Sequence, residues 1–147
     1  MRRLFLFSAV SVIGCGIPVG GTIEVRGDPN DSNFYVEPRT CVTGDRKGDF
    51  GVELGDASGT TLEFRHGGPE PPTVRITAPG YWHTDTLLIE PSDCAVFDGT
   101  LERGDEFKHG ARTMRGDLTL DCTLPSGDRV IGFAVFDECS SKKRGSD

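Results

Sequence analysis

The chain has 147 residues and a formal net charge of −7, a size typical of one globular domain. The acidic balance argues against binding to nucleic acid and against electrostatic attraction to anionic lipid headgroups. Twenty glycines and nine prolines are spread along the chain, and no segment keeps a 3.6-residue apolar period. The composition therefore disfavours long helices and favours short strands joined by turns.

The N-terminus has the layout of an export signal. Arg2 and Arg3 precede an apolar run at 4–10, which leads into Val12-Ile13-Gly14-Cys15. The run is too short to cross the hydrocarbon core of a bilayer, which takes about 20 residues. The alternatives are an ordinary cleaved signal with an incidental cysteine, and a first core strand of a cytosolic protein.

The ending Val12-Ile13-Gly14-Cys15 resembles the lipobox of bacterial prolipoproteins. The resemblance implies that 1–14 is a signal peptide, that cleavage occurs before Cys15, and that Cys15 is then acylated on its thiol and its new amino group. It implies a cell-envelope protein that is attached to the membrane through its lipid anchor. Gly16, not aspartate, follows Cys15, and in enteric bacteria this favours the outer membrane over the inner one.

Downstream of the signal, the sequence predicts a short tether at 15–21, one β domain at 22–139 and a disordered polar tail at 140–147. Alternation of apolar and polar residues, typical of a sheet with one wet face, is clear in four places: Val52-Glu53-Leu54, Leu62-Glu63-Phe64, Val74-Arg75-Ile76 and Leu118-Thr119-Leu120. The predicted strands are 22–26, 34–38, 50–54, 60–65, 73–77, 84–89, 94–101, 116–124 and 129–137. Eight or nine such strands predict an all-β fold, an antiparallel sandwich or a small barrel.

The last three strands allow a more detailed prediction. Strands 94–101 and 116–124 are expected to form a hairpin around a loop at 102–114, with at most one helical turn in that loop. Strand 129–137 is apolar on both sides. It is therefore expected to be a central strand covered on both faces, or covered on one face and at an edge.

Apart from Cys15, four cysteines remain, and an even number in an exported protein indicates two disulfides. Cys94 opens one arm of the expected hairpin and Cys122 closes the other, so both lie at the same end. Cys139 follows the last strand and lies at the opposite end, roughly 25 Å from Cys122 along the sheet. A disulfide tolerates only about 4.4–6.8 Å between α-carbons. This geometry favours Cys94–Cys122, and by elimination Cys41–Cys139.

Two segments are candidate ligand sites. Oxygen-bearing side chains at Asp28, Asn30 and Ser32 could wrap a calcium ion, but Asn33 and Arg39 break the EF-hand pattern at its glycine and glutamate positions. A plain turn rich in Asx residues is the favoured interpretation, with a weak metal site as the alternative.

The second candidate is the aromatic segment Tyr81-Trp82-His83, which could stack on a sugar or a peptide. Packing of the single tryptophan into the core is the alternative interpretation. The sequence shows no nucleophile motif, no zinc-ligand spacing and no cofactor motif.

The favoured function is a lipid-anchored envelope protein with a non-catalytic binding or structural role, with no cofactor and with a protein or glycan partner. The alternatives are a small secreted hydrolase or inhibitor with a site near 81–83, and a calcium-dependent adhesin that uses 28–33.

Overall fold

Two antiparallel sheets of five strands each make up the fold. The computed structural model describes residues 19–27, 33–43, 51–79, 86–108 and 111–140. The predicted all-β, disulfide-stabilised fold is confirmed, and of the two predicted forms the structure is the sandwich. The described part of the chain holds no α-helix, and its one 3-10 turn is η1, Pro91–Asp93.

Sheet A consists of strands from both ends of the chain. Its order is β2 (Phe34–Val36), β1 (Val19–Arg26), β10 (Arg129–Cys139), β9 (Ala111–Thr123) and β8 (Cys94–Lys108). Sheet B is a simple meander of consecutive strands. Its order is β3 (Thr40–Thr43), β4 (Gly51–Gly55), β5 (Thr61–Arg65), β6 (Thr73–Thr77) and β7 (Thr86–Ile89).

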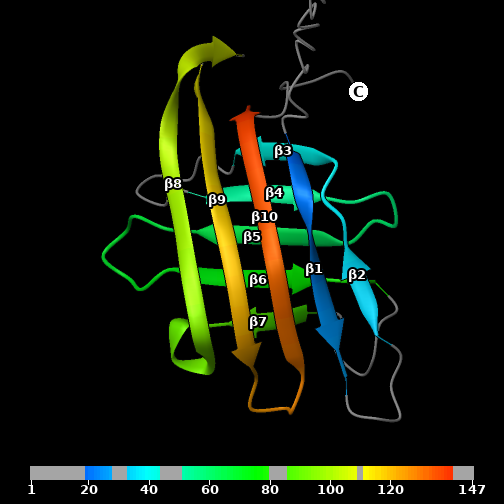
Figure 1. Cartoon of the computed structure of the whole chain (residues 1–147). Coiled ribbons are helices and arrows are strands. Elements are labelled where there is room, and N and C mark those ends of the chain that lie inside the picture. The colour runs from blue at the N-terminus through cyan, green and yellow to red at the C-terminus, as the bar shows by residue number, and fades with distance from the viewer. Residues whose placement is uncertain (1–18, 28–32, 44–50, 80–85, 109–110, 141–147) are drawn as a thin grey trace, which may run out of the picture.

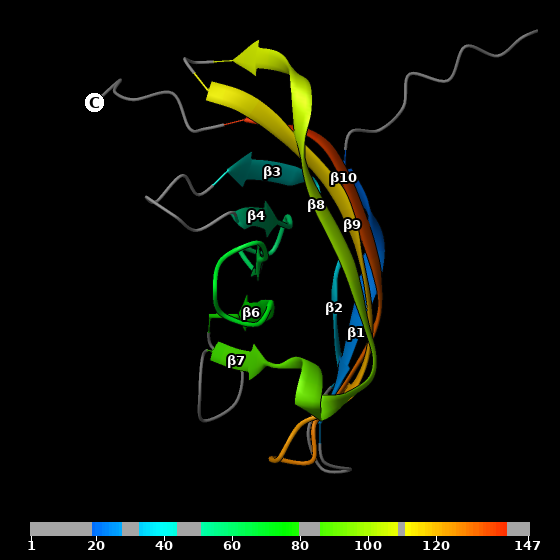
Figure 2. The same ribbon diagram turned by 90° about the vertical axis from the view of Figure 1, so that its left-hand side faces the viewer.

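The strands of sheet B run across those of sheet A (Figure 1). Figure 2 shows the two sheets edge-on as separate layers, with the core between them. This crossed arrangement is the orthogonal form of sheet packing.

Strand periodicity places the core. In the four alternating segments the apolar residues are at most 1% exposed, whereas the polar residue between them points away from the core. Phe64 is the largest fully buried side chain, and Phe97 packs on it with ring centroids 6.5 Å apart. The four predictions of one buried and one wet face are therefore confirmed.

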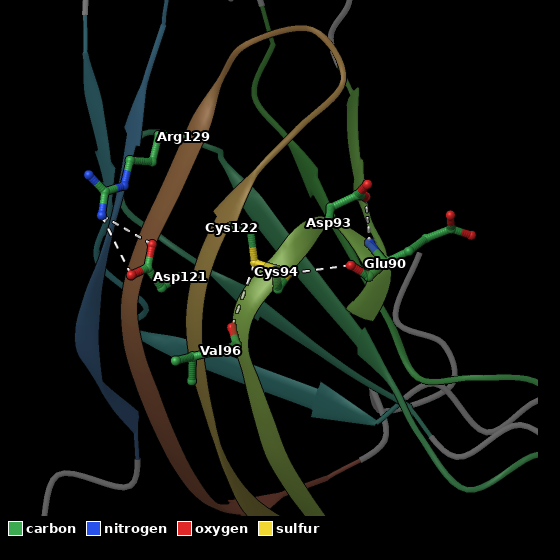
Figure 3. The surroundings of a disulfide bond; sticks show 7 residues. All are labelled: Glu90, Asp93, Cys94, Val96, Asp121, Cys122 and Arg129. Carbon is green, nitrogen blue, oxygen red and sulfur yellow. Dashed lines mark hydrogen bonds and ion pairs between the residues drawn. A yellow bond between two sulfur atoms is a disulfide. The ribbon is translucent and has the colours of Figure 1, made fainter.

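The disulfides join Cys41 to Cys139 and Cys94 to Cys122, the same pairs that the strand argument favoured. Cys41–Cys139 links β3 of sheet B to the end of β10 in sheet A, with 4.9 Å between the α-carbons. Cys94–Cys122 joins the neighbouring strands β8 and β9 within sheet A (Figure 3). One bridge thus ties the two layers together and the other closes the base of a hairpin.

The expected loop at 102–114 is wrong. β8 runs on to Lys108 and β9 starts at Ala111, so most of this segment is a paired strand. Its sequence hides the strand, because its described residues are mostly charged and exposed, and the buried ones, Gly104, Thr113 and Met114, show no apolar alternation. Cross-strand pairing supports it instead, including the ion pair of Arg115 with Glu102 at 3.5 Å.

Three smaller boundaries also differ. The first strand begins at Val19, within the segment assigned to the tether. Ser140, assigned to the tail, forms a parallel bridge with Val42, and its carbonyl oxygen accepts a hydrogen bond from the Thr43 N–H at 3.1 Å. β3 itself was not predicted, because four residues are too few to show a period.

β10 is central, as expected, but its second face is open. Phe133 and Val135 are 53% and 45% exposed, so the expectation that both faces, or one face and an edge, are covered is wrong. The physical reason is the number of layers. A two-layer sandwich covers each sheet on one side only, and sheet B covers the side of β10 that carries Val130 and Ala134.

Candidate binding surface

Most of the residues predicted to form sites lie outside the described ranges. These residues are Cys15, Asp28, Asn30, Ser32, Tyr81, Trp82 and His83. The lipid anchor, the calcium loop and the aromatic surface therefore stay predictions. A different surface emerges from the residues that the structure does describe.

Exposed apolar side chains gather on the outer face of sheet A. Six large apolar or aromatic side chains in the described part of the chain are exposed, and four of them stand on this face: Tyr35, Val96, Phe133 and Val135. Scattered exposed apolar residues are ordinary, but several on one face indicate an interaction surface.

The centre of this face is a stripe along β10, formed by Ile131, Phe133 and Val135, which we call the outer stripe. The three residues alternate with Val130, Gly132, Ala134 and Phe136, of which all but the half-buried Gly132 are buried, so they point to the same side of the sheet. Cross-strand pairing places Thr22 and Thr119 on either side of Phe133. These short side chains leave the phenylalanine ring standing above its neighbours.

A shallow hollow of about 360 Å³ adjoins the outer stripe. Its polar lining, which we call the acidic hollow, comes from Thr100, Glu102, Arg115, Asp117 and Asp137. Asp117 pairs directly with Val135 across the β9–β10 ladder, which makes the stripe and the hollow continuous. Within the hollow, the Thr100 hydroxyl donates a hydrogen bond to the Asp117 carboxylate.

Charge on this face is mainly negative. Strand register assigns it six carboxylates, those of Glu24, Asp98, Glu102, Asp117, Asp121 and Asp137, and three guanidinium groups, those of Arg26, Arg115 and Arg129. Each guanidinium has a carboxylate partner on the face, as with Arg129 and Asp121 at 3.2 Å (Figure 3). An excess of negative charge therefore surrounds the apolar centre.

The far end of the face carries a polar cluster around Glu24. The Arg26 guanidinium donates a hydrogen bond to Glu24 at 2.8 Å, and the Tyr35 hydroxyl lies 3.4 Å from the same carboxylate. The hydrogen bond from Arg26 is the main reason that the pKa of Glu24 lies below its usual value, and that the pKa of Arg26 lies above its own. Glu24 thus stays ionised and holds Tyr35 at the edge of the face.

The outer stripe and the acidic hollow place apolar side chains beside carboxylates. Within the described ranges no group of three or more His, Cys, Asp or Glu side chains is placed to hold a metal ion. The four described cysteines are all in disulfides, so none of them presents a thiol. An apolar centre beside carboxylates can accept an apolar side chain together with a cationic one.

A second hollow, of about 260 Å³, lies over the outer face of sheet B. Arg65, Arg75, Glu90 and His66 contribute to its lining, so cationic and anionic groups are mixed there. Leu88 is the one exposed large apolar side chain among the residues that line it. It lacks the continuous apolar centre that distinguishes sheet A.

Sequence reasoning missed the outer stripe, although a signal was present. The apolar residues on both sides of 129–137 predict a strand covered on both faces, or on one face and at an edge, whereas they mark one buried face and one exposed face. Tyr35 and Val96 gave no such signal, because each stands within a short apolar run, Phe34-Tyr35-Val36 or Ala95-Val96-Phe97, that does not show which of its side chains is exposed.

No family model, curated protein or solved structure matches the chain. Among the described residues there is no helix long and apolar enough to span a membrane.

Proposed function

We propose that this chain is a lipid-anchored, non-catalytic binding module of the bacterial cell envelope, and that it holds a protein partner on the outer face of sheet A. The observation that carries the binding role is the gathering, on that one face, of four of the six exposed large apolar side chains among the described residues. The resemblance of Val12-Ile13-Gly14-Cys15 to a lipobox supports the anchor.

Charge indicates the chemistry of the partner. Six carboxylates and three guanidinium groups surround the outer stripe, so a complementary surface presents lysine or arginine beside apolar side chains. A second copy of this chain would bring the same excess of negative charge face to face, which disfavours a symmetric dimer. The partner is therefore a different protein with a basic, apolar surface.

Photo-crosslinking in the intact cell tests the binding face. A photoreactive amino acid at Phe133 should give a protein adduct of one discrete mass. The same group at Leu88, which is 49% exposed on the outer face of sheet B, is the matched control and should give none. Asp117→Lys, which reverses a charge beside Val135, should abolish the adduct. Equal adducts at both positions, or none at Phe133, would overturn the assignment of the face.

The anchor and the absence of catalysis need their own measurements. A fatty-acid analogue should label the protein, and Cys15→Ser should remove the label. An unlabelled wild-type protein that keeps residues 1–14 would refute the anchor. Turnover of any substrate by the purified protein, abolished by a point change in this chain, would refute the non-catalytic role.

A further inference from the structure

The β8–β9 hairpin projects beyond the rest of sheet A. Val19, the first residue of β1, is level with Phe136 on β10, and Phe136 is level with Gly116 on β9. From Gly116 the hairpin continues five residues further, to Ala111, about 17 Å of strand beyond the level of Val19. β10 accompanies it as far as the pair Cys139 and Met114, so the last three residues, about 10 Å, project beyond β10. Figure 2 shows this extension bending over the end of the sandwich where β3 lies.

The tip of the hairpin carries an exposed aromatic ring. Phe107 is 68% exposed, more than any other exposed large apolar side chain in the described ranges. The Arg112 guanidinium lies over the ring, 5.6 Å from its centroid. An aromatic ring beside a cationic group is the pairing that membrane interfaces favour, because the ring enters the apolar boundary and the cation stays among the headgroups.

Ion pairs fix this tip to the sandwich. The Lys108 ammonium donates to Glu138 at 2.8 Å and lies 3.1 Å from Glu106. The hydrogen bond from Lys108 to Glu138, followed by the contact with Glu106, keeps the pKa of Lys108 above its usual value. The exposed ion pair of Lys108 with Glu138 thus links the tip of the hairpin, where Phe107 stands, to the end of β10.

The hairpin tip and the first residue of the sandwich lie at the same end of the molecule. β1 and β9 both start at the end where β10 finishes, since each is antiparallel to β10 (Figure 1). Cys15 stands four positions before Val19, and four residues span at most about 14 Å. A bilayer that holds a lipid on Cys15 is therefore within about 14 Å of Val19, a distance comparable with the length of the hairpin extension.

We propose that Phe107 enters the boundary between headgroups and acyl chains of the bilayer that holds the anchor, and that the hairpin thereby fixes the orientation of the domain. This inference rests on the lipid anchor of the proposed function. The contact is apolar in origin, because Glu106, Glu138 and the net charge of −7 oppose attraction to anionic lipid. The lipid keeps the ring at a high local concentration near the surface, which favours a contact made by a single side chain.

Tryptophan quenching tests the depth of the tip. The lipidated full chain is placed in phosphatidylcholine vesicles with or without bromine on the acyl chains. Phe107→Trp and its matched control Phe133→Trp both replace an exposed phenylalanine and both keep Trp82 as a constant background. Bromination should lower the emission of Phe107→Trp beyond that of the parent protein. In Phe133→Trp the loss of emission on bromination should be no larger than in the parent.

Amide hydrogen exchange gives a readout with the native ring. On vesicles, amide exchange across 103–108 should be slower in the parent than in Phe107→Ser. In the control, both proteins also carry Cys15→Ser and are measured without vesicles, and the difference in exchange should vanish. Equal quenching at 107 and 133, with the lipid on Cys15 verified by mass spectrometry, overturns the hairpin contact and leaves the anchor standing. A mass without lipid overturns the proposed anchor and this inference together.

Discussion

Gly132 tests the described pairing of β1 with β10 most sharply. Its φ of +144° is a conformation that side chains rarely adopt, and an added Cβ would overlap the carbonyl oxygen of Thr22 and lie 2.8 Å from the Cα of Ile23. Both obstacles are backbone atoms, which cannot turn aside as a side chain can. Backbone strain costs about 1–3 kcal/mol and the forced displacement of packed strands about 1–3 kcal/mol more. Gly132→Ala should therefore lower the free energy of unfolding by roughly 2–6 kcal/mol.

Two other glycines separate the cost of backbone strain from the cost of displacing packed strands. Gly59 has φ of +87° with nothing within 4 Å of an added Cβ, so Gly59→Ala should cost only the backbone term, about 1–2 kcal/mol. At Gly20, φ is ordinary and the nearest heavy atom, the Val135 Cγ2, is 3.9 Å away, so Gly20→Ala should be neutral or stabilise by up to about 1 kcal/mol.

Equilibrium urea unfolding with the disulfides intact measures all three glycine variants under the same conditions. The expected order of cost is Gly132→Ala, then Gly59→Ala, then Gly20→Ala. If Gly132→Ala unfolds within about 0.5 kcal/mol of Gly20→Ala, a difference typical of neutral surface changes, the close approach of β1 to β10 is refuted.

Three further predictions address the core, the covalent link between the sheets and the outer face. The double variant Cys41→Ser with Cys139→Ser opens a loop of 98 residues and should lower the free energy of unfolding by about 4.7 kcal/mol in urea, and a loss near zero would show that the bridge restricts the unfolded chain little. Phe64→Ala empties the centre of the core and should cost about 3–5 kcal/mol in the same assay, whereas a loss under about 1 kcal/mol would contradict its full burial. Arg26→Ala should raise the pKa of Glu24 towards its usual value in an NMR titration of the carboxylate. Because that pKa is lowered in the folded state, the stabilisation is present above the unfolded pKa and is lost as pH falls through the folded one; an unchanged pKa in the variant would contradict the ion pair.

The fold class could be predicted because period-two alternation depends on local residue order. In Val52-Glu53-Leu54 each side chain reports its own face, and no knowledge of the partner strand is needed. The same rule failed at 102–114, where most of the described residues are exposed and the buried ones, Gly104, Thr113 and Met114, show no apolar alternation. It also failed at β3, whose four residues are too few to show a period. This strand is held in place by its pairing with β4 and by the disulfide at Cys41.

The candidate surface could not be predicted in the same way, because strand order creates it. Tyr35, Val96 and Phe133 are far apart in the sequence and share one face because β2, β10 and β8 belong to one sheet. β1 comes to lie between β2 and β10 by pairing with a strand more than 100 residues away in the chain. Long-range register of this kind is set by burial of the core face, and the outer face acquires its neighbours as a consequence.

The two proposals constrain each other through the geometry of sheet A. β10 ends at the same end of the molecule at which β1 begins, so an anchor before Val19 and a bilayer contact at Phe107 would both lie at that end. The outer stripe runs along β10, away from that end, and Phe133 is three residues before Phe136, the partner of Val19. A domain held at both points would turn its outer face sideways to the bilayer. Phe133 would then lie roughly 10 Å of strand below the level of Val19, on the side away from the bilayer. The partner best placed to reach that face is therefore one held in the same membrane, since the shared surface confines both proteins to one layer and raises their effective concentration.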